Sequence, residues 1–293
     1  MEIIYPIKIE YDKSIKGASR IYRSMALLIE SFQEYDEYIA HLIFKGVKIE
    51  QYLDAIEVSS LKSFIRELFI ESDEDSLSSS KIKVEQVENY VKTSHRDIIS
   101  TLNDNKIINS SITFENLSKK IEENADQSGL KSGNLYIPPL AKDLIPIVSE
   151  LNTALNTLHN SEIVIVSNNM ELKIDKERII SIDDIRKDMT KTTTVTSGTK
   201  ILQLKKPDLL GNSKWDFKHG NHPMEVKILD IDWLNEIQSG RIPIIAGDSV
   251  QAKIRTVSSY DNDGVLIDEE HFLESFEKFI PKQKGNGELY EKQ

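Results

Sequence analysis

The sequence of 293 residues contains no cysteine. Disulfide bonds, thiolate-bound metals and cysteine nucleophiles are therefore excluded, and the chain suits a reducing compartment. Long apolar runs are lacking too: a membrane-spanning helix needs about 20 apolar residues, and the most apolar stretch, Met25 to Phe44, contains four acidic residues. The N-terminus, MEIIYPIKIEYDK, is acidic and alternating, unlike a signal peptide with its basic start and unbroken apolar core. We expect a soluble cytoplasmic protein.

Basic residues are fewer than acidic residues. Lysine and arginine number 37 against 48 aspartates and glutamates, which gives a formal net charge of −11. That balance argues against mainly electrostatic binding to nucleic acid or to an anionic membrane, although it allows a local basic patch. Common enzyme motifs are absent as well: the sequence has no nucleophile elbow, no glycine fingerprint for dinucleotides, no phosphate loop and no calcium loop.

The first part of the chain alternates between strand and helix patterns. Residues 3–11 place apolar side chains at every second position, which predicts a strand. Apolar residues at three- and four-residue steps then predict a long amphipathic helix from Ser19 to Lys45. A second strand is predicted over 47–58, where a slip in the alternation indicates a bulge. Ser59–Ser60 would then cap a short helix over 61–69.

The middle of the chain has a helical character. Glu71 to Ser80 is acidic and serine-rich, which is typical of a solvated linker. Helices are predicted over 84–102 and 114–124. Pro138–Pro139 opens a third helix, which Pro146 should kink or delay.

Strand patterns dominate after residue 160. A hairpin is predicted over 163–174 and a short helix over 182–189. The β-branched run 192–204 predicts a strand that is broken at Ser197–Gly198. From Ser213 to Ile254 apolar and polar residues alternate on both sides of one helical stretch, which predicts a small curled sheet or barrel.

Together these patterns predict an α+β protein. We expect an N-terminal strand–helix–strand–helix lobe, a helical middle and a C-terminal β-rich lobe with barrel-like curvature. The first domain is placed at residues 1–160 with its linker at 71–80, the second at 161–281, and a disordered tail at 282–293.

Asp216 and Glu225–Val226–Lys227 form the most specific arrangement for catalysis. A carboxylate followed by Glu-x-Lys on a strand resembles the pattern of a metal-dependent nuclease, in which two carboxylates hold Mg²⁺ and the lysine orients or activates water. The alternative is the solvated face of an amphipathic strand, where Glu-x-Lys is common. His219 and His222 flank a Gly-Asn turn and could bind a metal if one of these carboxylates joined them; the alternative is a pair of exposed loop histidines.

Trp215 and Phe217 are candidates for binding nucleic acid. They share one face of a strand, and small barrels bind single strands by stacking bases on exposed aromatics beside a basic groove. The alternative is that both rings belong to the core. Seven lysines give this region positive charge: Lys200, Lys205, Lys206, Lys214, Lys218, Lys227 and Lys253.

Two stretches also carry a resemblance. YPIKIEYDKSIKGASRIYRSMALLIESFQ, followed by LDAIEVSSLKSFIREL, resembles the opening of uncharacterised bacterial and mobile-element proteins that begin with strand, long helix and strand. The pattern VTSGTKILQL…SKWDFKHG…MEVKILDIDWLNEIQSGRIPIIAGDSVQAKI resembles a C-terminal β module of such proteins, sometimes found near defence genes. The resemblance implies a bacterial or phage-related cytoplasmic protein with two lobes, and it brings no activity or functional residues with it.

Three functions are therefore expected, in this order. The first is a non-enzymatic binding or assembly component without a cofactor, because the amphipathic helix at 19–45 could present a surface to another protein or to a second copy of the chain. The second is a nucleic-acid-binding module in the C-terminal lobe. The third is a Mg²⁺-dependent nuclease that uses Asp216, Glu225 and Lys227.

Overall fold

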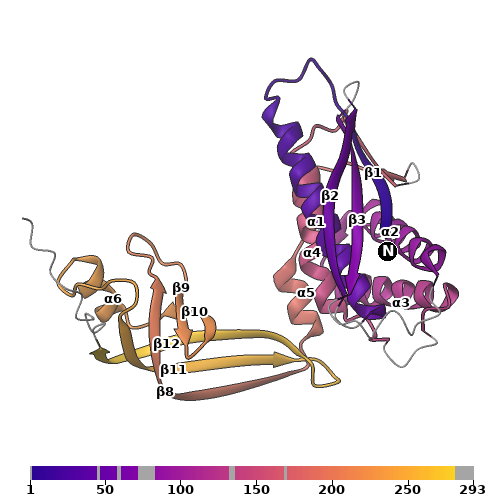
Figure 1. Cartoon of the computed structure of the whole chain (residues 1–293). Coiled ribbons are helices and arrows are strands. Elements are labelled where there is room, and N and C mark those ends of the chain that lie inside the picture. The colour runs from indigo at the N-terminus through magenta and orange to yellow at the C-terminus, as the bar shows by residue number, and fades with distance from the viewer. Residues whose placement is uncertain are drawn as a thin grey trace, which may run out of the picture. The chain divides into compact units, whose positions relative to one another are not determined.

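The computed structural model describes residues 2–44, 47–57, 61–71, 83–131, 136–167 and 170–280. The chain divides into two compact units, Met1–Asp188 and Met189–Gln293, called unit 1 and unit 2 below. The predicted α+β class is confirmed, because unit 1 combines a sheet with helices and unit 2 contains a closed barrel (Figure 1). The predicted linker, from residue 72 onward, and the predicted tail lie outside the described residues.

Unit 1 is organised around a five-stranded sheet with the order β2-β3-β1-β5-β6. Each neighbouring pair in this sheet is antiparallel. In the central strand, Ile3, Tyr5, Ile7 and Ile9 point into the core, which is the alternation that the sequence predicts. The strands are β1 (Glu2–Glu10), β2 (Val47–Glu57), β3 (Leu61–Glu71), β5 (Ile163–Val166) and β6 (Met170–Leu172).

Helices complete the core of unit 1. The long helix α1 buries Leu28, Phe32 and Ile39 completely, at the spacing of a single apolar face. It packs against the sheet and against α4, in which Pro146 is accommodated inside the helix. A small parallel pair joins β4 (Ile107–Ile108) to β7 (Ile179–Ile180). The helices are α1 (Ser19–Ile43), α2 (Val84–Asp104), α3 (Ser111–Gln127), α4 (Ala141–Asn156) and α5 (Ile182–Met189).

Residues 61–69 form strand β3, and the predicted helix there is wrong. The strand pairs with β1 on one side and with β2 on the other. Its buried positions alternate, but two of them are polar, Ser63 and Glu67. Polar residues at inward positions hid the period of two, so the remaining apolar residues matched a helical spacing by coincidence.

The two units meet in sequence between Asp188 and Met189, whereas the change from helix to strand patterns predicts a boundary after residue 160. The hairpin of β5 and β6 belongs to unit 1, because β5 pairs with β1 from Ile7↔Val166 to Glu10↔Ile163. A sheet that recruits a late strand in this way gives no compositional signal at the point where the chain returns.

Unit 2 is a closed barrel with the strand order β10-β12-β11-β8-β9. The barrel closes through the parallel pair β10 and β12, and its other pairs are antiparallel. Strand β8 keeps its register with β11 through Ser197–Gly198, so the predicted break does not occur. The elements are β8 (Thr192–Lys206), β9 (Trp215–His219), β10 (His222–Ile228), α6 (Ile231–Gln238), β11 (Ser249–Tyr260) and β12 (Leu266–Ile280).

The barrel core is apolar and rich in aromatic rings. Trp233 of α6 stacks on Phe276 at 5.0 Å between ring centroids and lies 5.7 Å from Trp215. The short helix α6 is therefore part of the barrel core. Within the part of the chain that the structure describes, no helix is both long and apolar enough to cross a membrane.

Candidate functional site

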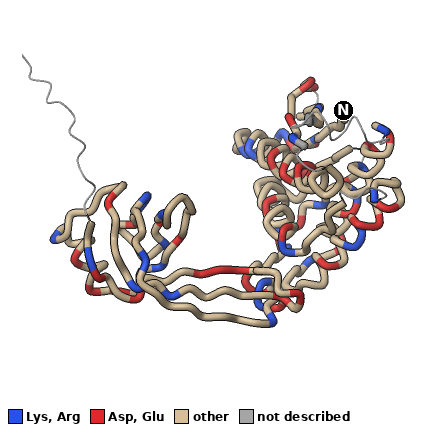
Figure 2. The backbone as a smooth tube through the Cα atoms, turned by 60° about the horizontal axis from the view of Figure 1, so that its bottom comes forward, with Lys and Arg blue, Asp and Glu red and all other residues tan. Residues whose placement is uncertain are grey.

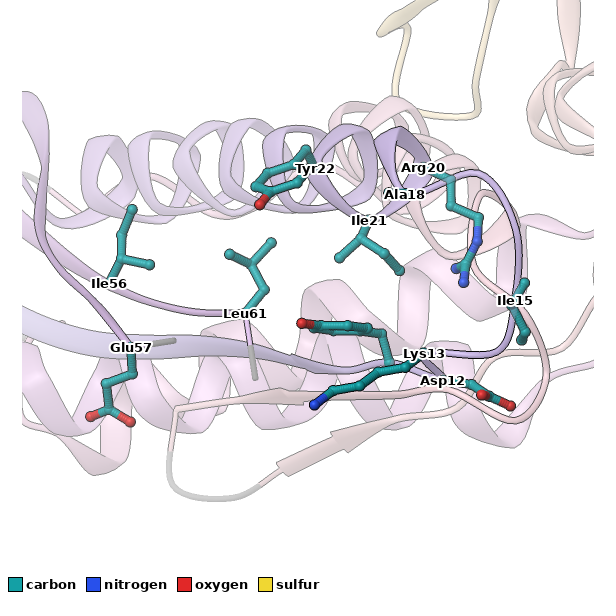
Figure 3. Close-up of a pocket in the computed structure, with 11 residues that line it drawn as sticks. Asp12, Lys13, Ile15, Ala18, Arg20, Ile21, Tyr22, Ile56, Glu57 and Leu61 are labelled. Atoms are coloured by element: carbon teal, nitrogen blue, oxygen red, sulfur yellow. The ribbon is translucent and has the colours of Figure 1, made fainter. Parts of the chain in front are cut away.

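A cavity of about 520 Å³ opens in unit 1 beside the start of α1. Its walls come from the connection between β1 and α1, from the first turns of α1 and from the ends of β2 and β3. Ile21 and Tyr22 extend from the helix toward Ile56 and Leu61 of the strands, so that apolar side chains face one another across the space (Figure 3).

A second cavity of about 370 Å³ continues the first along the helix. The two share Tyr22, Ile56 and Leu61, and the second adds Met25 and Ile29 of α1 together with strand residues. We call the combined space the α1–hairpin groove. It is lined chiefly by Ile21, Tyr22, Met25 and Ile29 of α1 and by Leu53, Ile56, Leu61 and Ile65 of the β2–β3 pair.

The rim of this groove is apolar and open to solvent. Tyr22 is 68% exposed, Leu53 56% and Ile56 54%. A β-bulge explains why two residues three positions apart in one strand face the same groove: Leu53 pairs with Ile65, the register shifts, and Ile56 then pairs with Ser63. The slip in the alternation of residues 47–58 predicted this bulge, which the structure confirms.

A buried carboxylate fixes the charged end of the groove. Glu162 has a fully buried side chain and forms an ion pair with Arg20, whose Nη2 lies 2.6 Å from Oε1. The carboxylate also accepts hydrogen bonds from the backbone N–H groups of His159 and Asp12. Burial acts to raise the pKa of Glu162, but these hydrogen bonds outweigh it and hold that pKa below its ordinary value. The loop that carries Asp12 is thereby fixed beside the cavity.

Behind the groove, five side chains form a polar cluster in the core: Tyr5, Asp36, Glu67, His95 and Ser167. The Tyr5 hydroxyl donates to Asp36 Oδ2 at 2.8 Å and lies 3.2 Å from Glu67 Oε1. His95 places Nε2 2.7 Å from Asp36 Oδ1 and Nδ1 3.0 Å from Ser167 Oγ. The cluster thus joins β1, α1, β3, α2 and the end of β5.

Burial sets the protonation of this cluster. It raises the pKa of Glu67 to about 10, with the neighbouring Asp36 adding to the shift, and raises the pKa of Asp36 to about 7. It lowers the pKa of His95 to about 4, so the imidazole is neutral at pH 7. When Asp36 is ionised, its contact with the neutral His95 is a hydrogen bond with Nε2–H as donor, which leaves Nδ1 to accept from the Ser167 hydroxyl.

Serine, histidine and aspartate follow one another in this cluster as they do in hydrolase triads. A nucleophile must, however, meet a substrate, and Ser167 is only 5% exposed while Asp36 and His95 are fully buried. Neither cavity of the groove is lined by Ser167 or His95. The cluster therefore holds elements of unit 1 together.

One residue connects the cluster to the groove. Gln51 lines the second cavity and donates a hydrogen bond from Nε2 to Glu67 Oε1 at 3.2 Å.

Sequence reasoning missed the cluster. The available signal was polar residues at inward positions, Asp36 on the apolar face of α1 and Glu67 in β3, and such residues look like surface residues until the partner elements are known.

The structure brings together some of the predicted catalytic residues. Asp216 and Glu225 are direct cross-strand partners of β9 and β10, and Lys227 follows on the same face of β10. This face is the outside of the barrel, where Glu225 and Lys227 are exposed. His219 and His222 pair at the turn of the same hairpin and are exposed as well. Across the described ranges, no group of three or more histidines, aspartates or glutamates is arranged to hold a metal ion.

The predicted aromatic binding residues lie in the core. Trp215 is 1% exposed and Phe217 is fully buried, with their rings stacked at 6.2 Å between centroids. A base cannot stack on either ring, so the structure corrects their assignment as a binding surface.

No family model, curated protein or solved structure matches this chain.

Proposed function

We propose that this chain is a non-enzymatic binding component of a bacterial or phage-related system, acting in the cytoplasm, and that the α1–hairpin groove takes an apolar segment of a partner protein. The observation that supports this most is the exposed apolar rim formed by Tyr22, Leu53 and Ile56. Contiguous apolar surface around a hollow costs solubility and usually marks an interaction site. The bacterial or phage setting rests on the resemblance of the two sequence stretches.

The shape of the groove favours a chain segment over a compact small molecule. Two cavities follow one another along α1 and share Tyr22, Ile56 and Leu61, so the space is elongated. Binding pockets for small molecules bury most of the ligand surface, whereas here the rim stands open. An elongated apolar groove is the surface into which an amphipathic helix lays successive anchoring side chains.

Charge favours a partner with an acidic group near the start of α1. The acidic side chains of β2 beside the groove are already paired, Glu57 with Lys62 and Asp54 with Arg66, each at 3.3 Å. Lys13 lines the first cavity (Figure 3) and forms no salt bridge with any described residue. A carboxylate of the partner would meet this ammonium group at the end of the groove.

Site-specific photo-crosslinking tests the proposal. A photoreactive phenylalanine analogue replaces Leu53 in the groove or, as a matched control, Ile112 on α3, which is similarly exposed at 50%. We expect a crosslinked product of one discrete mass from position 53 in cells, its loss on adding Ile56→Asp, and no such product from position 112. Equal products from both positions, or none from position 53 in a variant with unchanged thermal unfolding, would count against the groove.

A second candidate function, the Mg²⁺-dependent nuclease, is supported by the cross-strand register of Asp216 and Glu225 with Lys227 on the same face. It requires cleavage of an oligonucleotide that depends on added Mg²⁺ and falls at least roughly a hundredfold in Glu225→Ala, since each carboxylate would hold the ion. Cleavage that is unchanged in this variant would rule out the nuclease.

A further inference from the structure

Part of unit 2 extends beyond the barrel as a three-stranded sheet, which we call the arm. It consists of Thr192–Thr199 of β8, Lys253–Tyr260 of β11 and Leu266–Glu270 of β12 (Figure 1). Strand β11 is central in the arm, because it pairs with both of the others. Strand β9 pairs with β8 only from Gln203 onward.

The outer side of β8 therefore has no strand beside it over Thr192–Thr199 among the residues that the structure describes. All eight residues of this segment are exposed, and Val195 is 59% exposed. In a strand that pairs on one side only, alternate backbone N–H and C=O groups point outward and can pair with another strand.

The two edges of the arm differ in charge. The β12 edge contains Asp268, Glu269 and Glu270 in succession, which form a red run in Figure 2. The β8 segment, TTTVTSGT, contains no charged residue and no proline, and this stretch is tan in the same view. Acidic residues on an edge strand repel an approaching strand, so only the β8 edge lacks this protection.

The edge strand β2 of unit 1 has the protective features that the β8 segment lacks. Strand β2 carries Lys48, Glu50, Asp54 and Glu57 along its length, and its bulge interrupts the regular edge. Charges and bulges are two of the ways in which natural sheets prevent edge-to-edge pairing. The β8 segment has neither, since its pairing with β11 runs without a register shift from Tyr260↔Thr192 to Ser249↔Gln203.

We propose that the β8 edge pairs with the β8 edge of a second copy of this chain, antiparallel and across a two-fold axis. The segment is uncharged, so it offers no charge pattern by which a foreign strand would be selected. Self-pairing with the axis at Val195 places Thr194 opposite Thr196 and Val195 opposite its own copy, and with the axis at Thr196 it places Thr193 opposite Thr199. Paired β-branched residues of this kind are a favourable cross-strand combination. A β12 edge could not associate in the same way, because its acidic run would face an identical acidic run.

The flanking lysines are compatible with such a pair. With the axis at Val195, Lys200 of one copy lies opposite Thr190 of the other, and with the axis at Thr196 it lies opposite Thr192. In neither register does a lysine face a lysine. The two copies bury the same patch, so the contact is closed and gives a dimer, without further growth into a fibre.

Sedimentation of the full chain over a range of concentrations tests the dimer. We expect dissociation to a monomer on dilution and a dissociation constant raised at least roughly tenfold by Val195→Lys, which places two ammonium groups close together at the axis. The matched control is Leu266→Lys on the other edge of the arm, at a residue that is 39% exposed, and it should leave the dissociation constant unchanged.

Disulfide trapping gives an independent test, because the chain has no cysteine of its own. Under mild oxidation, Val195→Cys or Thr196→Cys should give a covalent dimer, and Leu266→Cys should not. A monomer at every concentration overturns the proposal. So does a dimer that survives Val195→Lys and forms equally from Leu266→Cys, or an assembly larger than a dimer. The groove variant Ile56→Asp should leave the dimer intact, so failure of one proposal is distinguishable from failure of the other.

Discussion

The cores of the two units differ in chemical composition. The barrel core consists of apolar and aromatic side chains, in which Trp215 contacts both Phe217 and Trp233. The core of unit 1 instead encloses Asp36 and His95, which have no solvent exposure. An apolar core derives its stability from buried area and close packing, neither of which depends on pH, whereas a polar cluster is favourable only while each member keeps its partner and its proton. Unit 2 should thus tolerate changes of pH that unit 1 does not.

This difference has a structural benefit for unit 1. Four elements each contribute one member of the cluster with specific geometry: β1 gives Tyr5, α1 Asp36, β3 Glu67 and α2 His95. Hydrogen bonds are directional, so the cluster defines one relative placement of these elements, whereas apolar contacts tolerate sliding. The groove lies between two of the elements that are fixed in this way, α1 and β3.

The largest effect that we predict is a loss of stability of unit 2 when its aromatic core is disrupted. Trp215→Ala should lower the free energy of unfolding of unit 2 by about 5 kcal/mol, because it removes the ring that touches both Phe217 and Trp233. Denaturant unfolding followed by hydrogen exchange in each unit measures the loss. Ile201→Ala, at a residue of the same barrel that is 53% exposed, should cost less than about 0.5 kcal/mol. A loss spread equally over both units would contradict the separate cores.

The next effect is a dependence of the stability of unit 1 on pH, which unit 2 should not share. Because the pKa of Glu67 is raised from 4.5 to about 10, the folded state holds a proton that the unfolded state has lost, and unfolding becomes easier as pH rises from about 4.5 to about 10. The slope should approach about 1.4 kcal/mol per pH unit in unit 1. Glu67→Gln, which cannot titrate, should flatten this slope, and unit 2 should show none of it.

Below pH 7 Asp36 and His95 act in opposite directions, while Glu67 continues to stabilise the fold as pH falls toward about 4.5. The raised pKa of Asp36 stabilises the fold as pH falls toward 4, whereas the lowered pKa of His95 destabilises it below about 6.5, because the unfolded imidazole takes up a proton that the folded one excludes. The effects of Asp36 and His95 therefore largely cancel, and stability should keep rising from pH 7 toward about 5 with the slope that Glu67 sets. A flat profile between pH 6.5 and 5 that His95→Gln turns into a rise in stability would show that Asp36 does not compensate.

A somewhat smaller effect is expected when the cluster loses one member. Asp36→Ala should destabilise unit 1 by about 3 kcal/mol, since the Tyr5 hydroxyl and His95 Nε2–H are then buried without an acceptor. Asp36→Asn keeps an acceptor oxygen and should cost less. Thermal unfolding of the two variants, compared with wild type at pH 7, measures the difference. If the two variants are equally destabilised, the hydrogen bonds of Asp36 contribute little.

The smallest effect concerns the charged end of the groove. Arg20→Ala should cost about 2 kcal/mol, because the buried Glu162 carboxylate keeps its backbone donors but loses its guanidinium partner. The pKa of Glu162 should then rise toward its ordinary value, so part of the loss should be regained at lower pH. NMR titration of the Glu162 carboxyl follows this change, and an unchanged pKa would show that the two backbone donors alone determine it.

The sequence predicts much of this architecture. Most of the helices, the barrel and even the bulge in β2 follow from apolar spacing, because periodicity reports which face of an element is buried. What spacing cannot report is a polar residue that is buried. Ser63 and Glu67 therefore turned strand β3 into an apparent helix, and Asp36 appeared as one more surface carboxylate.

The candidate sites were harder to predict than the fold. Alternation correctly indicated that Trp215 and Phe217 share a face, but it could not decide whether that face was inside or outside the barrel. The groove depends on a contact between α1 and a strand pair that begins after the helix has ended, and no local pattern contains such a contact. The order of β8, β11 and β12 in the arm is likewise a property of the closed sheet.

The parallel pairing of β10 with β12 has a consequence for synthesis on the ribosome. The barrel closes only when Val226–Ile228 meets His271–Leu273, so its hydrophobic interior stays open until the last strand has left the exit tunnel. Unit 1 has all of its described strands by Ile180 and can fold while that later segment is still being translated. Translation that stops before β12 would release a folded unit 1 joined to a barrel that lacks one of its strands, and such an open sheet is a substrate for chaperones and proteases.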